Sequence, residues 1–193
     1  YFREKYRKAD KDKEIATIMI QEVERLNRVV GELLDFSRPL SLHIQQVAVK
    51  PLIEKNLKMV SRRCRDASVV STLDVPDDGL CAPMDADKIS QVVLNLLLNA
   101  LDAMPTGGRL HVGVKRHGQK GLEITISDTG KGIDASDRPH IFEPYFSTKK
   151  SGTGLGLAIV RNIVKAHGGA IQLESRSGGG TRVAICLPPE LEA

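Results

Sequence analysis

The stretch 128–157 reads DTGKGI at 128–133, IFEPYFSTK at 141–149 and GTGLGL at 152–157. It contains one carboxylate beside two glycines, then an aromatic and basic segment, then a second glycine cluster that opens an apolar helix pattern. A carboxylate can accept a hydrogen bond from an exocyclic amine, and glycines let the backbone approach phosphates closely. A helix N-terminus offers free N–H groups to an anion. These features together predict a nucleotide site.

Two commoner phosphate motifs are excluded. A Gly-Lys-Ser/Thr sequence after four spacer residues does not occur in the chain, which excludes a P-loop. Gly152, Gly154 and Gly156 form G-x-G-x-G instead of G-x-G-x-x-G, and they follow the polar run Lys149–Ser151. The cluster therefore fails as a Rossmann turn on spacing and on context.

A polar stripe lies upstream, on a helix predicted from about Ala86 to Met104 with Asp85 as its N-cap. Asn95, Asn99 and Asp102 fall at i, i+4 and i+7, so they share one face of that helix. Two amides and a carboxylate can ligate a hard cation such as Mg²⁺ through oxygen. The alternative is an ordinary solvated helix face.

Four motifs in this order resemble those of the ATP-binding domain of sensor histidine kinases, and the resemblance covers nearly the whole chain. The segment 91–100 is similar to the family's N box, 128–132 and 152–157 to its glycine boxes, and 142–149 to its F box. The resemblance implies an α/β (α+β) two-layer sandwich of the Bergerat type. Its expected layers are about five mainly antiparallel or mixed strands with about three helices on one face, preceded by a long dimerising helix. The short lid looks most like that of nitrogen-regulation and zinc-associated sensor kinases.

The same resemblance implies the roles of the site residues, with ATP and Mg²⁺ as cofactors. Asn99 is the expected Mg²⁺ ligand, Asn95 lies close to the phosphates, and Asp128 accepts from the adenine amino group. Lys149 reaches a phosphate as a point charge. The expected catalytic residues are Asn95, Asn99 and Lys149, and the expected cofactor-binding residues are Asn99, Asp102, Asp128, Gly130, Gly132, Ile133, Thr148, Lys149, Gly152, Gly154, Leu155, Gly156, Leu157 and Thr181.

The segment 133–154 resembles the family's mobile ATP lid. Its aromatic residues, Phe142, Tyr145 and Phe146, are expected to anchor it by packing. The elements around the lid are read from apolar periodicity and turn residues. Helices are expected at Val49–Cys64 and Leu155–Ala166, and strands at Ser41–Val49, Ala67–Val75, Ala82–Asp85, Arg109–Arg116, Leu122–Ser127, Ala170–Ser175 and Thr181–Leu187.

Apolar residues at three-four spacing predict a long amphipathic helix over 14–37, which needs partner helices to bury its stripe. The resemblance makes it the second helix of a dimerising hairpin in a homodimer, and the alternative is an ordinary core-facing helix. The expected organisation is a partial dimerisation hairpin at 1–38, a linker and first strand at 39–48, and the ATP-binding catalytic domain at 49–193.

The family phosphorylates a histidine that is followed by Glu, and none of the five histidines here is followed by Glu. The acceptor is therefore expected upstream of Tyr1. We expect a protein-histidine kinase domain that binds Mg·ATP but does not phosphorylate itself, with relay to an aspartate of a response regulator. The alternatives are a switch ATPase of the same fold and a non-enzymatic ATP-sensing dimerisation module.

Composition limits the partners. The net charge of +4 is mild and its basic residues are dispersed, so no nucleic-acid footprint is predicted, and Arg62–Arg65 is expected to be a solvated helix face. The three cysteines are far apart without metal spacing, which is typical of reduced thiols in a cytoplasmic protein. No apolar run of about 18 residues occurs, so no direct membrane contact is expected, while inner-membrane anchoring of a longer parent stays open.

Overall fold

The computed structural model describes residues 13, 15–17, 19, 20, 22, 23, 31, 40–75, 79–117, 121–149 and 152–189. The chain divides into two units, Tyr1–Pro39 and Leu40–Ala193. In the first unit the described residues are helical and exposed, and Thr17 Oγ1 donates to the Lys13 carbonyl oxygen at 2.8 Å. Most of the predicted helix over 14–37 lies outside the described residues. Among those that are described, no helix is long and apolar enough to cross a membrane.

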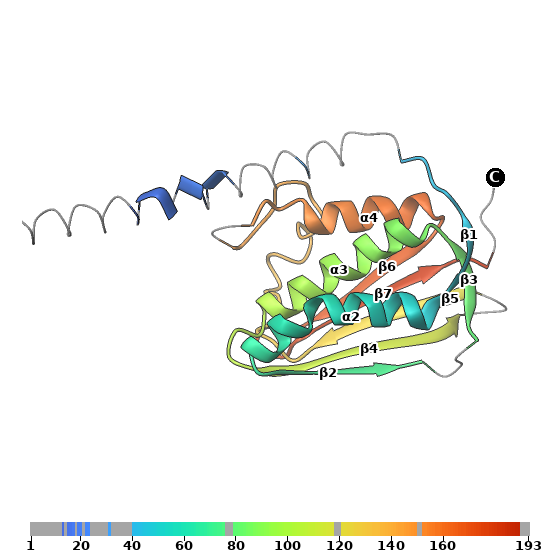
Figure 1. Ribbon diagram of the computed structural model, residues 1–193, viewed down its shortest axis with the longest axis horizontal. Helices are drawn as coiled ribbons and strands as arrows, with labels where there is room; N and C mark the ends of the chain where they lie inside the picture. The colour runs from blue at the N-terminus through green and yellow to red at the C-terminus, as the bar shows by residue number, and fades with distance from the viewer. Residues whose placement is uncertain are drawn as a thin grey trace, which may run out of the picture. The chain divides into compact units, whose positions relative to one another are not determined.

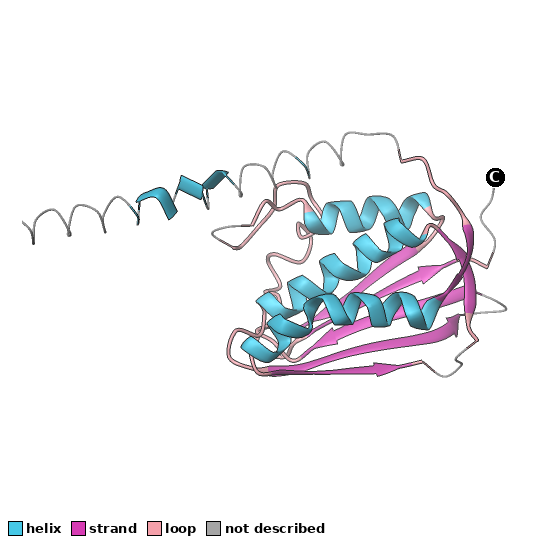
Figure 2. Cartoon of the chain, in the orientation of Figure 1, coloured by secondary structure: helices cyan, strands magenta, loops and turns pink. Residues whose placement is uncertain are grey.

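The second unit is a two-layer sandwich in which three helices cover one face of a five-stranded sheet (Figures 1 and 2). The sheet order is β2-β4-β5-β7-β6, with β2 and β4 parallel and the other neighbours antiparallel. The expected mixed sheet with helices on one face is therefore confirmed. The elements are α2 (Val49–Asp66), α3 (Ala86–Asp102), α4 (Gly156–Ala166), β2 (Val69–Asp74), β4 (Gly108–His117), β5 (Gly121–Asp128), β6 (Ala170–Ser175) and β7 (Thr181–Leu187).

Two further short strands form a separate antiparallel sheet. They are β1 (Gln45–Ala48) and β3 (Cys81–Met84), which pair with each other and not with the main sheet. Figure 2 shows them at the end of the domain opposite the loops that precede α4. Both segments are expected as extended from the sequence, but alternation within one strand does not identify its partner.

The strands of the main sheet have one apolar and one polar face, as a period of two requires. On the open face Glu123 accepts from Lys115 Nζ at 3.1 Å and from Arg182 Nη2 at 3.2 Å. Burial would raise the pKa of Glu123, but these cations and the Thr125 hydroxyl hold it below its ordinary value. The buried side chains of the helix-covered face include Leu110, Val112, Val114, Leu122, Ile124, Ile126, Val183, Ile185 and Leu187.

The start of α3 is fixed by Asp85, which confirms the predicted N-cap. The carboxylate accepts from the backbone N–H groups of Asp87 (3.1 Å), Lys88 (3.0 Å) and His43 (2.9 Å). Burial would raise the pKa of Asp85, but these N–H groups hold it below its ordinary value. Its own N–H donates to Nε2 of the buried His167, just after α4. A cap of this kind contributes about 1 kcal/mol. Here Asp85 also joins the start of α3 to His43, before β1, and to His167, just after α4.

Candidate nucleotide-binding site

The segments predicted to bind nucleotide meet at one end of the domain, where α3 and β5 end and α4 begins (Figure 1). In the antiparallel ladders Asp128 pairs with Thr181, and Thr181 pairs with Ser175. Directly paired residues of antiparallel strands project to the same face of a sheet. These polar side chains therefore form a row across β5, β7 and β6, on the same face as the apolar core.

The Asp128 carboxylate is half-buried at the last position of β5. Its Oδ1 accepts from the Gly130 N–H at 2.8 Å. Burial raises the pKa of Asp128 above its ordinary value, although hydrogen bonds from the N–H groups of Gly130 and Thr181 act in the opposite direction. A rigidly held, partly desolvated carboxylate keeps lone pairs for a donor such as an exocyclic amine.

The first glycine box lies against the turn that joins β6 and β7. Gly132 has φ 71°, and a Cβ on it would lie 1.8 Å from the Arg176 carbonyl oxygen, so only glycine fits. The Gly178 N–H donates to the Lys131 carbonyl oxygen at 2.6 Å. The Ile133 N–H donates to Ser175 Oγ at 2.9 Å, so the lid starts from a fixed point.

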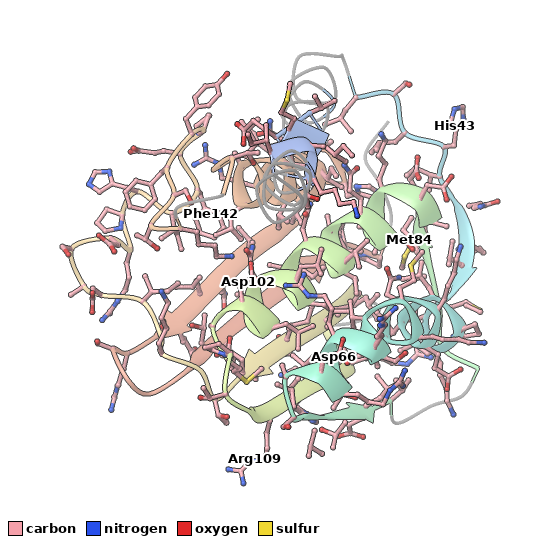
Figure 3. All side chains as sticks on the ribbon, turned by 60° about the vertical axis from the view of Figure 1, so that its left-hand side comes forward. His43, Asp66, Met84, Asp102, Arg109 and Phe142 are labelled. Carbon is pink, nitrogen blue, oxygen red and sulfur yellow. The ribbon has the colours of Figure 1, made fainter. Side chains whose placement is uncertain are left out.

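The predicted cation-binding residues meet at the end of α3, where Figure 3 shows Asp102. Lys149 Nζ donates to Asn99 Oδ1 and to Asp102 Oδ2, both at 2.7 Å. The other oxygen of Asp102 accepts from Arg63 Nη2 at 2.7 Å. The oxygens of Asn99 and Asp102 are thus already directed at a cationic group. Arg63 is exposed, as expected for the solvated helix face over Arg62–Arg65, and it reaches this carboxylate from there.

Asn95 faces the start of α4. A Cβ on Gly156, the first residue of α4, would lie 3.6 Å from Asn95 Oδ1. Within the described part of the chain no side chain caps α4, whose N-cap position is the fully buried Leu155. The first N–H groups of the helix are therefore available to an anion beside Asn95.

The lid folds back on the second glycine box. Gly154 has φ 72°, and a Cβ on it would lie 2.4 Å from the Tyr145 carbonyl carbon. Tyr145 itself is 64% exposed, and its backbone has φ 68°. Its expected anchoring role is wrong; among the described residues of the lid, Ile141 is the buried one, at 6% exposed. The Phe146 ring lies 5.8 Å from the His140 ring.

The other predicted residues lie around this core of the site. Thr148 and Gly152 are exposed in the lid, while Phe142, shown on the lid in Figure 3, and Leu157 are half-buried. Sequence reasoning did not single out Ser175, which is buried at the end of β6. A serine on the apolar face of the predicted strand, two residues after Leu173, was the available signal.

Residues 84–191 match the family described as histidine kinase-, DNA gyrase B-, and HSP90-like ATPases. The chain is 42% identical over 190 residues to the sensor histidine kinase ZraS of Escherichia coli O157:H7, which covers 97% of this chain and 41% of ZraS. It is 37% identical over 179 residues to the signal transduction histidine-protein kinase AtoS of Escherichia coli K12, covering 91% of this chain and 29% of AtoS. The chain thus spans less than half the length of these relatives.

Solved structures of histidine kinases have the same fold. The catalytic domain of histidine kinase ThkA superposes with a TM-score of 0.70 at 26% identity, covering 76% of this chain and 98% of that domain. Histidine kinase AdeS of Acinetobacter baumannii superposes with a TM-score of 0.76 at 28% identity, covering 90% and 83%. ThkA in complex with the response regulator protein TrrA gives a TM-score of 0.74 at 26% identity, covering 90% and 50%.

Proposed function

Because the chain belongs to the family of histidine kinase-, DNA gyrase B- and HSP90-like ATPases, and resembles the catalytic domains of sensor histidine kinases within it, we propose that it transfers the γ-phosphoryl group of Mg·ATP to a protein histidine. The observation that carries the proposal is the meeting of two ligand sets at one end of the domain. Asp128 and Thr181 form a polar pair across β5 and β7. Asn99, Asp102 and Lys149 form a charged cluster on α3 and the lid.

The residues at the phosphate end fit Mg²⁺. Asn99 Oδ1 and Asp102 Oδ2 are hard oxygen ligands, and both accept from an ammonium group at 2.7 Å, so they already hold a positive charge. Asn99 is the residue that we assign as the magnesium ligand. When bound, Mg²⁺ neutralises charge on the phosphates and orients them.

The protein's own contribution to phosphoryl transfer is positioning and charge. Asp128, at the end of β5, and Thr181, at the start of β7, fix the base. The N–H groups at the start of α4, beside Asn95, donate hydrogen bonds to phosphate oxygens. When ATP binds, the Lys149 ammonium exchanges its contacts with Asn99 and Asp102 for a contact with a phosphate. The phosphate attracts it more strongly, because it carries more negative charge than the Asp102 carboxylate.

We also assign the domains and partners from the family. The helix over 14–37 dimerises, 39–48 links it to the catalytic domain at 49–193, and the phosphoryl group passes to a response-regulator aspartate. The complex of ThkA with the response regulator protein TrrA supports that last step by analogy. The identity of 42% to a sensor histidine kinase favours this proposal over a switch ATPase.

The first test is calorimetric titration of Mg·ATP into this chain and into Asp128→Asn. We expect a Kd between about 1 μM and 1 mM for the natural sequence, and loss of most of that affinity in the variant. An exposed carboxylate on β2 gives the matched control, Asp74→Asn, which is expected to bind like the natural sequence. Absence of binding, or binding indifferent to Asp128, contradicts the proposed site.

The transfer step is tested with γ-labelled ATP and the longest natural form of the protein. Label is expected in an acid-labile, base-stable linkage, as a phosphohistidine requires. Asn99→Ala is expected to abolish the labelling. ATP turnover without such a labelled linkage would favour the switch ATPase instead.

A further inference from the structure

The Ser175 hydroxyl joins three segments at the base end of the site. Ser175 is 9% exposed at the last position of β6. Its Oγ contacts the Ile133 N–H, the Gly180 carbonyl oxygen and Thr181 Oγ1, each at 2.9 Å. A hydroxyl has one hydrogen to donate and two lone pairs to accept with, so three contacts use its full capacity.

The identity of the partners fixes the direction of each hydrogen bond. The Gly180 carbonyl can only accept, so the single hydrogen of Ser175 goes there, and the Ile133 N–H can only donate. The Gly180 carbonyl oxygen also accepts from the Arg176 N–H, at the long distance of 3.4 Å. The remaining contact requires Thr181 to donate to Ser175, because Ser175 has no second hydrogen.

Thr181 is therefore left with lone pairs only. Its neighbour on the same face is Asp128, whose ionised carboxylate also only accepts. The edge of the site thus offers acceptors and no hydroxyl hydrogen. A purine with an amino group at position 6 donates to this edge from that position, whereas a 6-oxopurine places an acceptor oxygen there and has its nearest donor at N1.

We propose that Ser175 is a specificity-determining positioning residue, which holds the Thr181 hydroxyl as an acceptor and so excludes 6-oxopurine nucleotides. The proposal rests on the proposed function of the site as an ATP site. Ser175 acts through Thr181 and does not itself touch the base.

The test compares ATP with inosine triphosphate, which has a carbonyl in place of the 6-amino group and a hydrogen on N1. The Kd of each is measured calorimetrically with Mg²⁺ for the natural chain and for Ser175→Ala. In Ser175→Ala the Thr181 hydroxyl is free to donate to the 6-oxo group. We therefore expect the Kd for inosine triphosphate, divided by the Kd for ATP, to fall by about 5-fold or more, as one hydrogen bond allows. Ser175→Thr keeps the hydroxyl and is expected to keep the natural ratio.

The matched control is Ser127→Ala, because Ser127 lies on β5 next to Asp128 but projects to the opposite face. It is expected to leave the ratio unchanged. If Ser175→Ala does not fold, Thr181→Val carries the test. Loss of the Thr181 acceptor is then expected to raise the Kd for ATP and to leave the Kd for inosine triphosphate unchanged.

A second control combines the two substitutions. With Thr181→Val in place, adding Ser175→Ala should leave the Kd ratio unchanged, since Ser175 acts only through that hydroxyl. If Ser175→Ala raised the Kd values for ATP and for inosine triphosphate by the same factor, the proposal would be overturned. Ser175 would then have only a structural role. A natural chain that binds neither nucleotide would instead contradict the proposed function.

Discussion

The two ends of the candidate site are built from different kinds of contact. At the base end, Asp128 and Ser175 bond mainly to backbone groups of neighbouring strands and turns, and Ser175 is buried. At the phosphate end, Asn99, Asp102 and Lys149 bond side chain to side chain. The side chains of Asp102 and Lys149 are 33% and 37% exposed.

This difference separates a preformed part of the site from an exchangeable part. The contacts of Asp128 and Ser175 tie the ends of paired strands to the turns beside them, so we expect the base end to keep its shape with or without ligand. An exposed ion pair contributes only about 0–1 kcal/mol. The phosphate end can therefore exchange its internal cation for the charges that Mg·ATP brings.

The largest effect on ATP affinity is expected for Asp128→Asn, which changes the preformed base end of the site. The amide retains one oxygen but turns an amino group toward the amino group of adenine. We expect ATP affinity to fall about 100-fold, near the upper range for a charged hydrogen bond. The fall should be the same with Mg²⁺ and with a chelator, measured by calorimetry. A fall that appears only with Mg²⁺ would break the distinction between the two ends.

Asn99→Ala is expected to affect only the exchangeable end. Loss of the amide oxygen should lower ATP affinity about 10-fold with Mg²⁺ and leave the affinity measured in a chelator unchanged. The ratio of the two affinities is the readout. Asp128→Asn serves as the control, because it should preserve that ratio while lowering both affinities.

Lys149→Met is expected to have a smaller effect, because Lys149 is exposed and pairs with an anion both without and with ATP. Without ATP the anion is Asp102, and with ATP it is a phosphate. We expect Mg·ATP affinity to fall by about 5-fold at most, with weaker dependence on salt than in the natural chain. Lys58→Met removes an exposed lysine of α2 and should change neither quantity. An effect of Lys149→Met as large as that of Asp128→Asn would place this lysine in the preformed part.

The smallest effect concerns stability and pH without ligand. A raised folded pKa means that Asp128 contributes stability that is fully present below the ordinary Asp pKa of about 3.9 and is lost as pH rises through the folded value. The unfolding free energy of the natural chain, measured in urea titrations, should therefore fall relative to that of Asp128→Asn as the pH rises above about 4.

Glu123, on the opposite face of β5, gives the contrast for that experiment. Its folded pKa is lowered, so its contribution is present above the ordinary Glu value of about 4.3 and is lost as pH falls through the folded value. Glu123→Gln should shift the pH profile in the opposite direction to Asp128→Asn. Equal directions for the two variants would contradict the different environments of these carboxylates.

Local patterns predicted the elements better than they predicted the contacts between them. The N-cap at Asp85 and the covered face of β5 follow from residues close together in sequence. Ser175 meets Ile133 across 42 positions, and Arg63 meets Asp102 across 39, and neither spacing has a local signature. Tyr145 faces outward because of its backbone conformation at φ 68°, which its residue type does not favour.

The parallel pair β2–β4 has a consequence for the order in which the protein folds. Parallel neighbours need a long crossover, and the crossover here contains α3 with Asn95 and Asn99. Pairing of distant strands must close a large loop first, which makes it a late and slow event. A chain that has not yet closed its sheet has no nucleotide site, so ATP acts only on the finished fold. Saturating nucleotide should then raise the melting temperature without acting on the unfolded chain.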